Sequence, residues 1–181
     1  MYQPQVPLMQ MSPAFRTARL AEVELGCLVL LHDEAGVGVR ADALSARGDL
    51  SEGVLRLSGG AVRFERRRLE EAVIAIDIEY ELQADLTAVL ARAPEPGDLI
   101  VAPNRPTAGL FVANLWGGGN GLLDVASALI RPYLATRAAP QTVLAWKLIE
   151  RSERSRVLLV HEAAEPMSRE LPRRAYGEDC D

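Results

Sequence analysis

The feature that most constrains the fold is a series of short segments in which apolar and polar residues alternate. The clearest pair lies at residues 54–57 and 62–65, on either side of Ser58-Gly59-Gly60. Two alternating runs around a glycine pair are typical of a β-hairpin. A second hairpin is predicted from residues 142–149 to 156–160, across a polar turn. The other segments that favour strands are residues 20–31, 37–39, 72–82, 99–101 and 110–116.

Two segments have helical spacing instead. One begins at Asp85, a good N-cap, places Leu86 and Val89 on one face, and ends before Pro94. The other follows a run of glycines and carries apolar residues at helical intervals from Leu122 to Ile130. We therefore predict an α+β fold, a mostly antiparallel and hairpin-rich sheet with two helices at about 85–93 and 121–137.

Composition divides the chain into a body and two ends. Residues 1–19 hold several prolines without periodicity and are interpreted as an extended N-terminal arm. Residues 20–162 form a single α+β domain in this interpretation, and residues 163–181 a polar, acidic C-terminal tail. A chain of 181 residues is long enough for one core that needs neither a disulfide nor a metal.

Charge and apolar content exclude several classes of protein. The chain has 25 acidic and 20 basic residues, which argues against a nucleic-acid surface. No segment approaches the roughly 18 consecutive apolar residues of a membrane span, and the N-terminus lacks the pattern of a signal peptide. We therefore expect a soluble, cytoplasmic protein with no membrane or nucleic-acid partner. All basic residues but Lys147 are arginine, a skew typical of GC-rich bacterial coding.

The most unusual local feature is the glycine run at residues 117–121. Glycine amides at the start of a helix can bind an anion, because the unpaired N–H groups and the helix dipole both favour negative charge. The spacing matches neither a dinucleotide fingerprint nor a phosphate loop, and Asp124 would repel a phosphate. A structural strand-to-helix turn is therefore the favoured interpretation. The candidate ligand-binding residues are Asn114, Trp116, Gly117, Gly118, Gly119, Asn120 and Gly121.

Other polar groups are weaker candidates. Asp77, Glu79 and Glu81 would share one strand face, where a hard cation could bind, but a solvated and ion-paired face is the favoured interpretation. His32 and His161 are the only imidazoles and follow apolar strands. No catalytic motif is present, so the catalytic residues stay unassigned, and we expect no metal and no cofactor.

Two hypotheses for function follow. The first is a non-enzymatic protein-interaction subunit or accessory factor of a cytoplasmic assembly, which uses sheet edges and terminal arms to contact a partner protein or a second copy of the chain. The alternative is a small enzyme or ligand-binding domain, with an anion or small-molecule site at the glycine run.

Overall fold

The computed structural model describes residues 15–31, 36–58, 62–101, 108–115, 119–135, 140–151 and 155–163. Strands make up 61% of the structure and helices 2%, so the α+β prediction is wrong and the fold is β-rich. Within these residues the one helical element is a single 3-10 turn, η1 (Leu20–Glu22). Among the described residues, no helix has the length and apolar character needed to cross a membrane.

The strands are short, from three to nine residues. In chain order they are β1 (Phe15–Arg19), β2 (Leu28–Leu31), β3 (Gly36–Leu44), β4 (Leu50–Arg56), β5 (Arg63–Arg66), β6 (Ala72–Ile76), β7 (Tyr80–Ala84), β8 (Val89–Ala91), β9 (Leu99–Val101), β10 (Gly109–Leu115), β11 (Gly119–Asp124), β12 (Leu129–Pro132), β13 (Gln141–Val143), β14 (Ala145–Glu150) and β15 (Val157–Glu162). The two hairpins predicted from the sequence are confirmed, as the antiparallel pairs β4–β5 and β14–β15.

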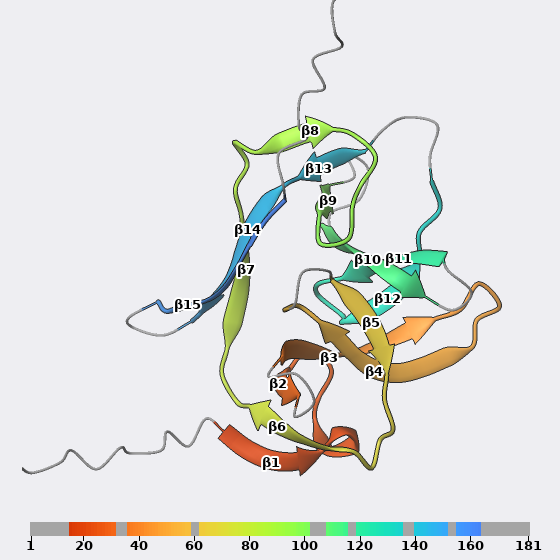
Figure 1. Cartoon of the computed structure of the whole chain (residues 1–181), viewed down its shortest axis with the longest axis vertical. Coiled ribbons are helices and arrows are strands. Elements are labelled where there is room, and N and C mark those ends of the chain that lie inside the picture. The colour runs from red at the N-terminus through yellow and green to blue at the C-terminus, as the bar shows by residue number, and fades with distance from the viewer. Residues whose placement is uncertain are drawn as a thin grey trace, which may run out of the picture.

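Six of these strands close into a ring (Figure 1). The pairs β3–β4, β4–β5, β10–β11 and β11–β12 are antiparallel. Two parallel contacts complete the circle: β12 meets β3 at Ile130 and Ala43, and β5 meets β10 at Arg63 and Ala113. The closed ring therefore gives these six strands neighbours on both sides, which removes the exposed edges that an open sheet would have.

The strands of the ring contribute small and branched side chains to one apolar cluster. Its ring members are Ala41, Ala43, Leu55, Phe64, Leu110, Val112, Leu115, Leu123 and Ile130. Gly121 of β11 leaves room for two of them, because a Cβ at this position would collide with the Leu115 and Ile130 side chains. Packing inside the ring, rather than a turn, explains this glycine.

The ring continues into open sheet on two sides. Strands β2, β6 and β1 extend it from β3, and strands β9, β13 and β8 extend it from β10. A separate three-stranded sheet, in the order β15–β14–β7, packs against the ring (Figure 1). Trp146 of β14 joins the ring cluster, and Leu82 of β7 and Leu159 of β15 pack beside it.

The first predicted helix, at about 85–93, is a turn followed by β8. The Asp85 carboxylate accepts hydrogen bonds from the Thr87 amide at 2.9 Å and the Thr87 hydroxyl at 2.6 Å, which is the geometry of an Asx turn. Val89 then pairs with Val143 of β13. A residue that caps helices well also caps turns, and the strand partner lies about fifty residues away, out of reach of a local pattern.

The second predicted helix, at about 121–137, is the hairpin of β11 and β12. Asp124 pairs with Leu129, and the Asp124 carboxylate accepts the Ala126 amide at 3.0 Å in the intervening turn. Leu123 and Ile130 face each other across the hairpin and are buried, while Val125 in the turn is exposed. Apolar residues on the two arms of a tight hairpin can mimic helical spacing, and that coincidence explains the error.

The predicted arm and tail are described only in part. Residues 15–19 of the arm form β1, which pairs with β6 in register from Phe15 and Ile76 to Arg19 and Ala72. Residues 1–14 and 164–181 lie outside the described residues. The division into arm, domain and tail stays a prediction.

Candidate functional site

The seven candidate ligand-binding residues around the glycine run lie partly in strands of the ring and partly outside the described residues. Asn114 belongs to β10, the first three residues of β11 are Gly119, Asn120 and Gly121, and the residues outside the described ranges are Trp116, Gly117 and Gly118. β11 continues the sheet here, so no helix begins at this point and the helix dipole that would favour an anion is missing. A ligand role for these residues stays a prediction.

The two histidines do not share a described site. His32 lies outside the described residues, and His161 lies in β15. The His161 ring stacks on the Trp146 indole, with centroids 5.1 Å apart and an interplanar angle of 16°. None of the described glycine-run residues lines the hollow that His161 borders.

The three carboxylates of the 72–82 segment are also dispersed. The strand breaks after Ile76, and Asp77 pairs with Arg16 of β1 at 2.9 Å. Glu81, in β7, lies 3.6 Å from Arg151. No group of three or more metal-binding side chains occurs in the described part of the chain.

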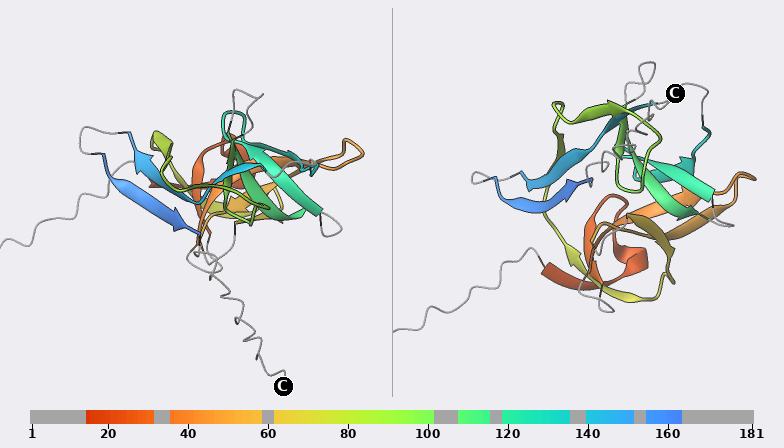
Figure 2. Two further views of the ribbon diagram at one scale, coloured as in Figure 1. Left: turned by 90° about the horizontal axis from the view of Figure 1, so that it is seen from above. Right: turned by 45° about the horizontal axis from the view of Figure 1, so that its top comes forward.

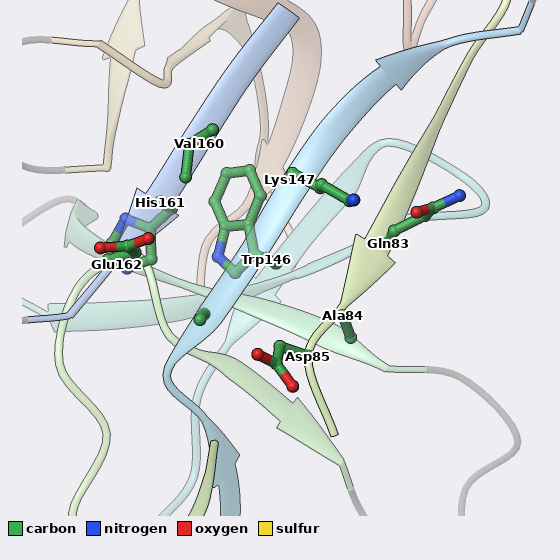
Figure 3. Close-up of a pocket in the computed structure, with 9 residues that line it drawn as sticks. Gln83, Ala84, Asp85, Trp146, Lys147, Val160, His161 and Glu162 are labelled. Atoms are coloured by element: carbon green, nitrogen blue, oxygen red, sulfur yellow. The ribbon is translucent and has the colours of Figure 1, made fainter. Parts of the chain in front are cut away.

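A hollow of about 360 Å³ lies on the outer face of the three-stranded sheet, at the end where β7 and β15 finish and β14 begins (Figure 3). Side chains that face outward line it in two rows across the sheet. One row is Asp85, Ala145 and Glu162, and the other is Gln83, Lys147 and Val160. Because Ala145 carries only a methyl group, the space between the flanking carboxylates stays open.

Charges in the hollow are mixed. Figure 3 shows the Asp85 and Glu162 carboxylates on the two sides of β14, with Lys147 farther along that strand. Hydrogen bonds from Thr87 lower the pKa of Asp85, so this carboxylate is ionised at neutral pH. Within the described residues, neither Asp85 nor Glu162 takes part in an ion pair.

Trp146 fixes the sheet that carries the hollow. The indole is 2% exposed and donates its N–H to the Gly97 carbonyl at 2.7 Å. Gly97 has φ +102° and lies so close to the His161 ring that a side chain would collide with it. Burial lowers the pKa of His161, and the negative charge of Asp98 partly opposes that shift.

Asp98 anchors the turn beneath Trp146. Its carboxylate is almost fully buried, accepts two hydrogen bonds from one Arg92 nitrogen at 2.8 and 3.0 Å, and accepts the Glu95 amide at 2.7 Å. Burial raises the pKa of Asp98 against the opposing effects of these donors. The network thus holds the Gly97 carbonyl in place for Trp146.

The edge of β15 next to the hollow is open. Within the described residues β15 pairs only with β14, and Figure 2 shows it at the outside of the molecule. The Ala163 amide donates to the Leu144 carbonyl at 2.8 Å. Residues bonded to the neighbouring strand alternate with residues whose N–H and C=O point away, so Val160 and Glu162 direct their main-chain groups outward.

Apolar side chains are exposed along the same strand. Val157 is 50% and Val160 58% exposed. A bulge shifts the register between Leu148 and Ile149 of β14, so that Val157 faces Ile149. Bulges are one of the ways in which proteins limit pairing at a sheet edge, which restricts regular pairing to the end of β15 beside the hollow.

A cluster of ion pairs centred on Glu65 lies outside the hollow. Glu65 of β5 accepts hydrogen bonds from Arg56 at 2.7 Å, Arg63 at 2.9 Å and Arg67 at 2.6 Å. Burial alone would raise the pKa of Glu65, but these three donors outweigh it and bring the pKa to about 2. The side chains of Glu65 and Arg67 are each 16% exposed, so this ion pair is largely buried.

Sequence reasoning missed the residues of the hollow. One signal was present: Lys147, the only lysine of the chain, alternates with buried residues in β14 and therefore faces outward. The sequence pattern predicts a helix cap at Asp85 and the end of the domain at Glu162. Nothing local in the sequence shows that β7 and β15 flank the same strand.

Taken together, the described residues define a β-rich protein with a closed six-stranded ring and a docked sheet whose outer edge is open. No protein-family model matches the chain, and no curated protein or solved structure is significantly similar to it.

Proposed function

We propose that this protein is an interaction subunit or accessory factor that binds an extended segment of a partner protein along the edge of β15. The observation that carries the proposal is the outward direction of the main-chain groups of Val160 and Glu162, next to a hollow of about 360 Å³. An extended segment that adds to such an edge gains main-chain hydrogen bonds, and neighbouring pockets select its side chains.

The exposed valines support the same proposal. A segment paired with β15 would cover Val160, and apolar area removed from water contributes about 25 cal/mol per Å². Because the bulge shortens the regular edge, the contact is small and belongs to the weak, transient class of interfaces. Contacts through the terminal arms remain part of the proposal, supported by Phe15, which is 51% exposed at the start of the edge strand β1.

A cytoplasmic location is likewise proposed. It is supported by Cys27, whose thiol is free, since reduced cysteines are the rule in a reducing compartment.

Replacement of Val160 by proline tests the edge directly. Proline removes the N–H of residue 160, which points away from β14. The hydrogen bonds between β15 and β14 therefore stay intact, and proline is tolerated at such positions of an edge strand. We expect heptapeptides selected from a displayed random library against the full chain to lose at least about tenfold in affinity for Val160→Pro. The affinities would be measured by calorimetry, and the circular dichroism melting curve would show that the variant stays folded.

Val160→Thr is the matched control, because it keeps the N–H and the β-branched shape of the side chain and exchanges only one methyl group for a hydroxyl. Selected peptides should bind it nearly as well as the wild type. Enriched peptides that bind the proline variant with full affinity, or a selection in which no peptide is enriched, would contradict the proposal.

A further inference from the structure

Building on the proposed function, we infer that the partner segment carries an arginine opposite Glu162, whose guanidinium enters the hollow over Ala145 between Glu162 and Asp85. The segment's next outward residue, two positions away, is apolar and lies beside Val160. The inference rests on the arrangement of three charges and one small side chain in the hollow.

The reach of the side chain selects arginine. Neighbouring strands lie about 4.8 Å apart, so a strand added to β15 runs about 10 Å from β14. Among the standard side chains, arginine is the longest that ends in a planar head. An extended arginine carries its guanidinium past β15 toward Ala145, and its several N–H groups can donate to two carboxylates at once. The hollow beside Ala145 accommodates this head. Figure 3 shows the Asp85 and Glu162 carboxylates on the two sides of β14.

The charges of the hollow match the guanidinium. Within the described residues Asp85 and Glu162 form no ion pair, although the positive charge of Lys147 helps to lower the pKa of Asp85. One Asp85 oxygen remains after the other accepts the Thr87 hydrogen bonds. Of the described residues that line the hollow, Lys147 is the single cation, and it lies in the neighbouring row with Gln83 and Val160. It therefore disfavours a second basic residue near Val160 and restricts the arginine to the row of Ala145.

The probe for this inference is a blocked heptapeptide of alternating threonine and valine with one central arginine. Its counterpart carries glutamine at the same position. We expect the full-length protein to bind the arginine peptide about five- to tenfold more tightly, with a difference that shrinks at high salt.

Substitutions in the hollow should change the affinity for the arginine peptide and leave the affinity for the glutamine peptide unchanged. Glu162→Gln and Asp85→Asn are each expected to weaken its binding about three- to fivefold, since each removes one carboxylate, and asparagine can still cap the Thr87 turn. Ala145→Leu should abolish the preference for arginine by filling the hollow. Lys147→Gln should strengthen binding of the arginine peptide by about two- to fivefold, because it removes the repulsive charge.

Glu79→Gln is the matched control, because Glu79 is an exposed carboxylate that directly precedes β7 and lies outside the hollow, and this variant should leave both affinities unchanged. Equal binding of the arginine and glutamine peptides to the wild type would overturn the inference while leaving the edge proposal intact. Loss of binding for both peptides in Val160→Pro supports the edge, whereas the absence of binding for both in the wild type removes the proposed function together with this inference.

Discussion

The Trp146→Ala variant is expected to lose about 3 to 5 kcal/mol of unfolding free energy, because truncation of a buried tryptophan removes packing and leaves a cavity. Trp146 belongs to the ring cluster, stacks on His161 and donates to the Gly97 carbonyl, so it holds the three-stranded sheet against the ring. Urea denaturation followed by far-ultraviolet circular dichroism measures the loss.

Two further variants separate packing from the hydrogen bond. Trp146→Phe retains an aromatic ring without the N–H and should cost less than the alanine variant, since a single hydrogen bond contributes about 1 kcal/mol net. Leu90→Ala removes an exposed leucine and should change stability by less than about 0.5 kcal/mol. A Trp146→Ala variant that unfolds at the same urea concentration as Leu90→Ala would show that the sheet does not depend on this residue.

The Glu65→Gln variant should have the second largest effect. Its carboxylate accepts hydrogen bonds from Arg56, Arg63 and Arg67, and Arg56 is 4% exposed in its side chain. A shift of the Glu65 pKa from 4.5 to about 2 corresponds to about 3 kcal/mol of stabilisation by the charged form. We expect the variant to lose about 2 to 3 kcal/mol at pH 7, the lower value allowing for solvent screening.

The pH dependence gives an independent check. The folded-state pKa of Glu65 lies below that of the unfolded chain, so the stabilisation is fully present above about pH 4.5 and is lost as the pH falls toward 2. Other carboxylates titrate in the same range, so the quantity to follow is the difference between wild type and Glu65→Gln. That difference should shrink from pH 4.5 to pH 2. A difference that stays constant over this range would contradict the assigned role of the charge.

Local patterns in the sequence were sufficient to predict the hairpins but not to predict how the hairpins pair with one another. The pair β4–β5 was visible because its two arms lie within a dozen residues and alternate on either side of glycine. Closure of the ring depends on Ile130 meeting Ala43 and on Ala113 meeting Arg63, contacts between segments far apart in the chain. Local residue patterns do not show which strands distant in the sequence pair with each other.

The predictions of two helices were wrong for a related reason. Asp85 and Asp124 are good helix caps, but each accepts hydrogen bonds in a turn instead, and the following residues find strand partners. The β-pairing of neighbours overrides a weak helical preference in short segments.

The site was predictable only in outline. The hairpin-rich pattern predicts a role for sheet edges. The hollow depends on Ala145 of β14 lying between Glu162 of β15 and Asp85, the residue after β7, and no local pattern shows that arrangement. The sequence predicts Gly121 as part of a possible ligand-binding loop, but the Leu115 and Ile130 side chains fill the space beside it. An unusual glycine in a sequence reports close packing as readily as ligand binding.

Residue-resolved amide hydrogen exchange by NMR on the free, full-length protein can show whether the edge of β15 is open. The amides of Val160 and Glu162 point away from β14 and should exchange at least about tenfold faster than those of His161 and Ala163, which the register directs toward it. Equal protection of all four amides would contradict the account, because it would mean that the edge is already covered or that β15 opens as a whole.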